Sequence, residues 1–171
     1  MENKYPNTII SNRKAILSNI TNYPSGSVKV TDTNSVNRIF DGRLSYNKGS
    51  YLLNMLRFKL GDSAFFKGIR QYQADPSLAY GFARTADLKR HLEEVSGQDL
   101  TVFFNQWYVG QGHPSYDVQW SQAGSNNVKI KMRQTTSDPS VTFFELPVPL
   151  KFKNATQEKT VIVDCKVNGE N

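Results

Sequence analysis

"RLSYNKGS" at residues 43–50, followed directly by "YLLNMLRFKLGD" at 51–62, is the stretch that decides the expected fold. The second part repeats apolar residues at helical spacing and so predicts an amphipathic helix with one apolar stripe: Leu52, Met55, Leu56 and Leu60. The first part places Tyr46, Lys48 and Gly49 on the opening turn of that helix. Glycine costs roughly 1 kcal/mol against alanine inside a helix. The sequence therefore indicates a close backbone approach at Gly49 or a particular direction for Tyr46.

Helical patterns continue on both sides of this stretch. An amphipathic segment covers residues 9–20, and a connector rich in Ser, Thr, Asn and Gly follows it, with a short strand predicted at 28–30. Further helices are predicted from about 62 to 74, from about 85 to 96, and from about 99 onward. The loops between consecutive helices are short, which favours antiparallel packing of neighbours.

At Gly110–Pro114 the spacing of the apolar residues changes from about 3.6 residues, typical of a helix, to 2 residues, typical of a strand. This is the clearest boundary in the sequence. Four alternating stretches follow, near residues 116–120, 128–132, 144–152 and 161–165. We expect an α+β fold, with a helical subdomain of antiparallel helices over 1–112 and an antiparallel β-sandwich over 113–171. The closing "KVNGEN" carries an Asn-Gly hairpin signal with no strand after it, so the sandwich is expected to be incomplete.

Composition excludes several classes of protein. The 171 residues carry a net charge of +6, but no basic run is long enough to predict nucleic-acid binding. No apolar run approaches the ~20 residues of a membrane helix, and the first residues do not resemble a signal peptide, so no transmembrane segment is expected and the compartment is left open. The single cysteine, Cys165, excludes an internal disulfide and a cysteine-rich zinc site.

No complete active site is encoded. The two histidines are not spaced as metal ligands; His91 is predicted to be a solvated residue in mid-helix, and His113 a hydrogen-bonding residue of the helix-to-strand connector. The chain has no His-Glu dipeptide, and so no HExxH zinc helix, and it lacks the Gly-x-Ser-x-Gly elbow and the P-loop.

The order of segments nevertheless resembles a known family. "RLSYNKGSYLLNMLRFKLGDSAFFKGIRQY" at 43–72, followed by "TADLKRHLEEVSGQDLTVFFNQWYVGQGHPSYDV" at 85–118, is similar to the aminopeptidase N-like zinc metallopeptidases (gluzincins). The resemblance covers residues 36–120. It implies that Tyr46 faces the zinc across the substrate carbonyl and donates a hydrogen bond to the developing oxyanion. It leaves the role of Lys48 open among a solvated lysine, a structural ion pair and a functional contact.

The HExxH motif, its downstream glutamate and the segment that reads the substrate amino group all precede Tyr-x-Lys-Gly in this family and are missing here. The resemblance therefore implies the C-terminal part of a catalytic domain and the start of a β-sandwich. The parent would be a zinc enzyme that removes N-terminal residues from peptides, and the missing N-terminal part would hold the zinc. The chain alone is expected to bind no zinc and to be inactive.

Two other functions remain open from the residues. The helices and strands could form a non-catalytic scaffold that binds a peptide or protein, in which case Tyr46 only packs at a helix start. Alternatively, the outward stripe of Lys129, Lys131 and Arg133 could bind a polyanion, although such a face is usually only solvated.

Overall fold

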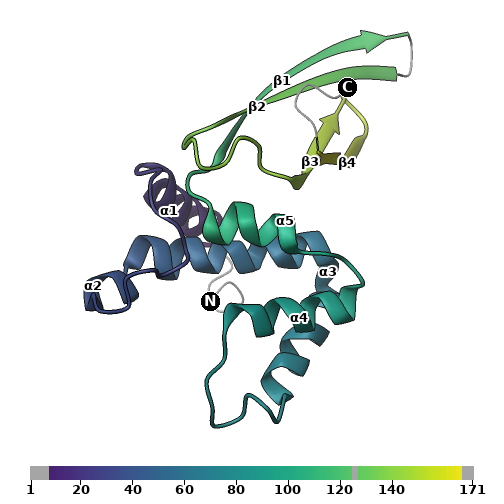
Figure 1. Cartoon of the computed structure of the whole chain (residues 1–171). Helices are drawn as coiled ribbons and strands as arrows, with labels where there is room; N and C mark the ends of the chain where they lie inside the picture. Colours follow the sequence, from purple (N-terminus) through teal and green to yellow (C-terminus); the bar gives the residue numbers. More distant parts are fainter. Residues whose placement is uncertain (1–7, 125–126, 167–171) are drawn as a thin grey trace.

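Helices occupy one half of the molecule and two β-hairpins the other in the computed structural model (Figure 1), which describes residues 8–124 and 127–166. The elements in chain order are α1 (Ile9–Thr21), α2 (Val36–Ile39), the π-helical segment η2 (Gly42–Lys48), α3 (Gly49–Ala74), α4 (Thr85–Ser96), α5 (Thr101–Phe104), the π-helical segment η3 (Asn105–Val109), β1 (Pro114–Ala123), β2 (Asn127–Thr136), β3 (Leu146–Lys153) and β4 (Glu158–Cys165). The predicted α+β class is confirmed. Within the described ranges, no helix is both long and apolar enough to cross a membrane.

The long helix α3 consists of two helical stretches that meet at Gly61. The backbone of Gly61 has φ 77° and ψ 158°, a left-handed conformation that glycine adopts without the steric cost of a Cβ. The chain bends there, as Figure 1 shows, and the second stretch packs against α4. Gly68 lies in this contact, where an added Cβ would be 2.8 Å from Leu92 Cδ2. Glycine at this position therefore allows the two helices to approach closely.

One apolar core joins the helices to the chain that precedes β3. Its buried members are Leu52, Leu56, Phe65, Leu92, Leu100, Phe103, Phe104, Trp107, Val141 and Phe144. The rings of Trp107 and Phe144 have centroids 4.4 Å apart. Phe144 is fully buried although it lies outside any strand, and burying such a side chain contributes roughly 2–3 kcal/mol. Helices end at Val109 and strands begin at Pro114; the division into domains at residue 112 stays a prediction.

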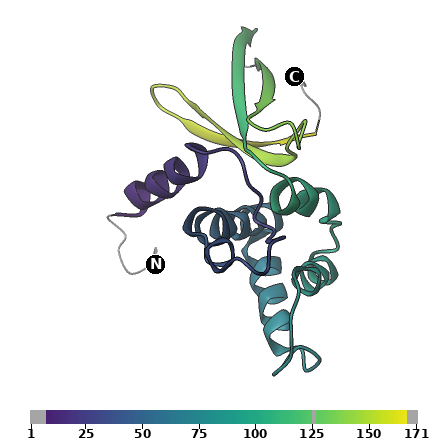
Figure 2. The ribbon, with the colours of Figure 1, turned by 60° about the vertical axis from the view of Figure 1, so that its left-hand side comes forward.

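The strands form two separate antiparallel hairpins. β1 pairs with β2 from Pro114↔Thr136 to Ala123↔Asn127, and β3 pairs with β4 from Leu146↔Cys165 to Lys153↔Glu158. Figure 2 shows that the hairpins run in different directions from their common base. Within the described residues each sheet has only two strands. The incomplete sandwich therefore remains a prediction, and the Asn-Gly signal at residues 168–169 lies outside the described residues.

The third strand starts at Leu146, two residues later than the alternation predicts. The cause is Gln134, whose side chain takes the place of a strand partner for Phe144. The Phe144 N–H donates to Gln134 Oε1 at 2.6 Å, and Gln134 Nε2 donates to the Phe144 carbonyl at 3.0 Å. The N–H and the carbonyl of Phe144 are thus both hydrogen-bonded without pairing to another strand.

Candidate functional site

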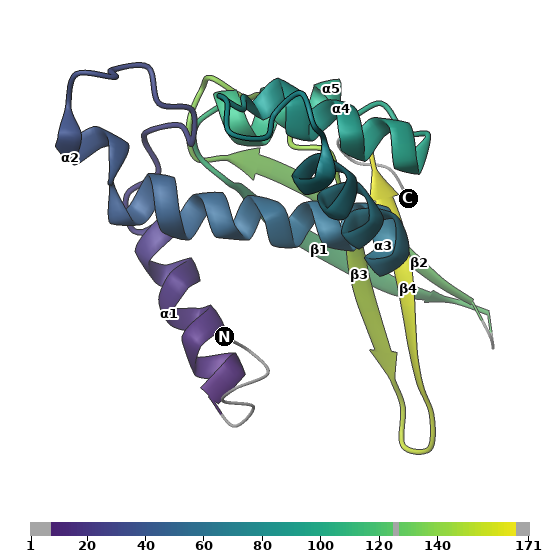
Figure 3. The same ribbon diagram turned by 90° about the horizontal axis from the view of Figure 1, so that it is seen from below.

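Tyr46 lies in the π-helical segment η2, which leads into α3 (Figure 3). The Tyr46 N–H donates to the Asp41 carbonyl five residues back at 3.3 Å, and the Asp41 carboxylate caps the segment by accepting from the Leu44 N–H at 2.6 Å. The sequence had placed Tyr46 on the first turn of the amphipathic α-helix, and this detail is wrong. Single π-helical turns are rare and occur frequently at functional sites.

The side chain of Tyr46 points out of this segment, while residues on either side of it point in. Tyr46 is 57 % exposed, whereas Leu44 is 5 % and Lys48 is 6 % exposed. In the part of the chain that the structure describes, no group hydrogen-bonds the Tyr46 hydroxyl. The phenol thus keeps its full capacity to donate to a molecule outside the chain.

Residues 23–29, here called the strap, cross η2 and are held by side chains. Three basic residues donate to strap carbonyls: Arg43 to Tyr23 (2.7 Å) and Ser25 (2.9 Å), Arg38 to Ser27 (2.7 Å) and Lys29 (3.1 Å), and Lys48 to Gly26 (3.3 Å). Within the described residues no strand forms at 28–30, where one was predicted; the carbonyl of Lys29, in the middle of this stretch, accepts from Arg38. No pattern in the sequence predicted that Arg38 and Arg43 bind the strap.

Glycine is needed at Gly26 and not at Gly49, where a close backbone approach was expected. An added Cβ at Gly49 would meet its nearest atoms at 3.8 Å, an ordinary contact, so the structure does not require glycine there. At Gly26, φ is 93° and an added Cβ would lie 2.6 Å from Leu44 Cδ1. Gly26 therefore has both a backbone conformation and a spacing that side chains tolerate poorly.

Lys48 is a buried amine at the junction of the strap and η2. The pKa of Lys48 is lowered to about 8, first by burial and then by the nearby charge of Arg43, while the charge of Asp138 acts in the opposite direction. Asp138 belongs to the turn after β2, close to the connector that carries Gly112. Lys48 thus lies where the helices and the chain leading to the strands meet.

His113 hydrogen-bonds within the connector, as the sequence predicted. Its N–H donates to Ser137 Oγ at 2.9 Å, and its carbonyl accepts from the Ser137 N–H at 3.1 Å. Burial, with a smaller effect from Lys48, lowers the pKa of the His113 imidazole. Across residues 8–124 and 127–166, no three His, Cys, Asp or Glu side chains lie together in a way that could hold a metal ion.

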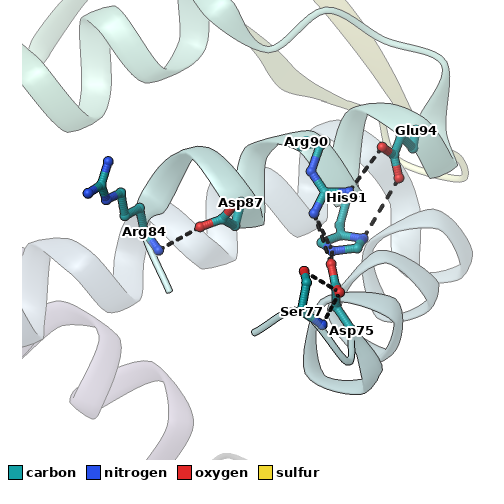
Figure 4. Close-up of polar contacts among 7 residues, drawn as sticks. All are labelled: Asp75, Ser77, Arg84, Asp87, Arg90, His91 and Glu94. Carbon is teal, nitrogen blue, oxygen red and sulfur yellow. Dashed lines mark hydrogen bonds and ion pairs between the residues drawn. The ribbon is translucent and has the colours of Figure 1, made fainter. Parts of the chain in front are cut away.

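A second polar cluster joins the end of α3 to α4 (Figure 4). His91, predicted to be solvated, is only 6 % exposed, and that prediction is wrong. The loop after α3 folds Asp75 back onto α4, where Asp75 Oδ2 lies 2.9 Å from His91 Nε2 and 2.9 Å from an Arg90 guanidinium nitrogen. Asp75 Oδ1 accepts from the hydroxyl and the N–H of Ser77 at 2.7 and 2.9 Å.

These contacts make Asp75 a structural anion. Hydrogen bonds from Ser77 and then from Arg90 hold the pKa of its carboxyl below the ordinary value. Arg90 also pairs with Glu94 at 3.2 Å. The carboxylate is occupied by groups of its own chain, so we interpret the cluster as a clamp between two helices.

Comparison with known proteins identifies relatives of the whole helical half. The family model described as "Peptidase family M1 domain" matches residues 4–107. The alanine/arginine aminopeptidase of Saccharomyces cerevisiae is 39 % identical over 144 residues, which cover 81 % of this chain and 16 % of that protein. The mitochondrial aminopeptidase 2 of the same yeast is 32 % identical over 141 residues, covering 79 % of this chain and 14 % of the relative.

A solved structure supports the fold independently. The crystal structure of Legionella pneumophila aminopeptidase A in complex with aspartic acid matches with a TM-score of 0.65 and 18 % sequence identity. The match covers 88 % of this chain and 17 % of the other. The chain therefore spans only about a sixth of the length of the proteins it resembles.

Proposed function

Since this chain belongs to peptidase family M1, we propose that it is a section of a zinc metallo-aminopeptidase in which Tyr46 stabilises the oxyanion of the transition state. The relatives are aminopeptidases, which supports a peptide substrate cleaved at its N-terminal residue. The observation that carries the assignment is the Tyr46 phenol, exposed and without a hydrogen-bond partner in the described part of the chain, on a segment whose neighbouring side chains are buried.

The chemistry follows from the properties of a phenol. Its O–H donates one hydrogen bond, and attack on a peptide carbonyl moves negative charge onto the carbonyl oxygen. A donor held in place before the reaction stabilises that charge without reorganising, and removing one such donor typically costs on the order of 3 kcal/mol, or 100-fold in turnover. The buried residues on either side, Leu44 and Lys48, would keep Tyr46 from moving away from the substrate.

Zinc would be held by a part of the parent outside this chain. The described residues do not fit a zinc site, which needs three or four converging His, Cys, Asp or Glu side chains. We therefore expect the isolated chain to retain no stoichiometric zinc and to cleave no aminoacyl substrate. Metal analysis after chelation and reloading tests this: one tightly held zinc per chain would show that the ligands are present after all.

The decisive experiment uses the parent enzyme. Tyr46→Phe keeps the ring and removes the donor, so turnover should fall about 100-fold while zinc content and KM change little. Tyr23→Phe is the matched control: Tyr23 belongs to the strap but binds Arg43 through its backbone carbonyl, so the variant removes only another exposed phenol and should leave turnover unchanged. Normal turnover of the Tyr46→Phe enzyme would exclude the oxyanion role.

A further inference from the structure

We propose that Lys48 is a positioning residue for Tyr46: by binding the strap at Gly26, its buried amine fixes the direction in which the phenol leaves η2. The inference rests on the proposed function of Tyr46 for its catalytic meaning. Its structural content, that Lys48 orients Tyr46, stands on the contacts of Lys48 alone and is testable without activity.

The first support is the burial of the amine. Lys48 is 6 % exposed, and its Nζ donates to the Gly26 carbonyl at 3.3 Å. Taking an ammonium group out of water is costly unless it is paired, and an apolar side chain of similar length would fill the same space at lower cost. A lysine at this position therefore indicates that its hydrogen bond specifies a geometry.

The second support is that Gly26 is held firmly on its other side. The Gly26 N–H donates to Gln111 Oε1 at 2.6 Å, and the Gln111 N–H donates to Ser140 Oγ at 3.0 Å. Gln111 belongs to the connector and Ser140 to the turn before β3. By binding Gly26, Lys48 therefore attaches η2 to a fixed point of the fold.

The third support is the position of Leu44, which meets the same glycine. Leu44 and Lys48 lie two residues before and two residues after Tyr46, and Leu44 packs so closely on Gly26 that no Cβ fits there. The two inward side chains around Tyr46 are thus anchored at one residue of the strap. If the contact of Lys48 is lost, one of the two anchors fails, and the phenol gains freedom to turn.

The charged groups that face Lys48 come from three elements. Arg43 lies on η2, Asp138 in the turn after β2, and His113, whose pKa Lys48 lowers, in the connector. Burial, and then the charge of Arg43 opposed by that of Asp138, leaves the amine close to deprotonation in mildly alkaline solution. Loss of the proton weakens the hydrogen bond to Gly26, because a charged donor binds more strongly than a neutral one.

The experiment places 3-fluorotyrosine at position 46 alone and follows its ¹⁹F resonance in the isolated, folded chain. We expect Lys48→Met to move the resonance toward its value in the denatured chain, and Lys48→Arg to restore most of the wild-type value. Lys67→Met is the matched control, since Lys67 is an exposed lysine on α3. Circular dichroism verifies that each variant is folded. A resonance unchanged by Lys48→Met would overturn the inference.

A second measurement keeps the inference testable should Lys48→Met not fold. For this titration position 46 carries 4-fluorophenylalanine, which has no ionisable hydroxyl, and its resonance should titrate with a midpoint near pH 8, that of Lys48. Asp138→Asn removes a charge that favours protonated Lys48 and should lower this midpoint. A resonance that shows no transition near pH 8, or one that Asp138→Asn leaves in place, would contradict the orienting role.

The parent enzyme separates this inference from the proposed function. If Tyr46 is catalytic and Lys48 orients it, Lys48→Met lowers kcat about 100-fold with little change in KM. A displacement of the Tyr46 hydroxyl by about 1 Å is enough for such a loss. If Tyr46→Phe has normal activity but Lys48→Met moves the ¹⁹F resonance, the orienting role stands and the catalytic role fails. If Tyr46→Phe is impaired but Lys48→Met changes neither kcat nor the resonance, only the positioning role fails.

Discussion

The contact between α3 and α4 and the region where the strap crosses η2 both bury charged side chains, but they differ in what they leave exposed. Between α3 and α4, Asp75 is fully engaged by Ser77, Arg90 and His91. At the strap, Lys48 and Arg43 of η2 and Arg38 of α2 bind strap carbonyls, while Tyr46 projects from η2 with a hydroxyl that has no partner in the described structure.

The difference separates a structural cluster from a candidate functional group. His91 and Tyr46 both lie on helical segments where the sequence suggested accessible side chains, and only Tyr46 is accessible. Removing a residue from the helix contact should therefore reduce stability and removing Tyr46 should not. Four measurements on the isolated chain test this comparison, in order of expected effect.

The largest effect is expected for Leu92→Ala. Leu92 is fully buried beside Gly68, and truncating such a side chain leaves a cavity, so the free energy of unfolding should fall by about 3 kcal/mol. Denaturant unfolding measures it. Leu53→Ala, at an exposed position in the first stretch of α3, should cost less than about 1 kcal/mol. Equal losses would mean that the α3–α4 contact is not specifically packed.

The next effect is the pH dependence contributed by Lys48. Its folded pKa of about 8 lies below the unfolded value of 10.5, so the unfolded chain holds the extra proton and stability rises with pH between these values. From about pH 7 to about pH 9.5 the contribution is roughly 2 kcal/mol. Lys48→Met should abolish this part of the rise in denaturant titrations. An identical pH profile in the variant would show that the amine is well solvated.

A smaller effect is expected for Asp75→Asn. The change removes the carboxylate that contacts both Arg90 and His91, although Arg90 keeps its pair with Glu94, and Tm should fall by several degrees near neutral pH. Because the folded pKa of Asp75 is depressed, its contribution is present above about pH 4 and is lost as pH falls through the folded pKa. The two Tm values should therefore converge in acid. Asp117→Asn, on exposed β1, serves as the control.

The smallest effect is expected for Tyr46→Phe. The hydroxyl has no partner among the described residues and the ring is more than half exposed, so the free energy of unfolding should change by less than about 0.5 kcal/mol. Thermal unfolding beside Asp75→Asn makes the comparison direct. A loss as large as that of Asp75→Asn would identify Tyr46 as a structural residue and remove the contrast between the two regions.

The sequence by itself determined the order and the kind of the elements. Apolar spacing predicted α3 with its break at Gly61, α4 up to Gly97, and the change to strands after Gly110, and the structure confirms each. The reason is physical: a helix that buries one face repeats its apolar residues about every 3.6 residues, and a strand every 2 residues, whatever they pack against. The order of motifs likewise indicated the family to which the chain belongs.

Only the tertiary structure decided which polar residues are available. Whether His91 is solvated depends on Asp75, sixteen residues away, and the environment of Lys48 depends on Gly26 and Asp138, far from it in the chain. Hydrogen bonds and desolvation act through space between side chains, and they leave no period in the sequence. For the same reason the π-helical turn at Tyr46 and the strap at 23–29 became visible only in the folded chain.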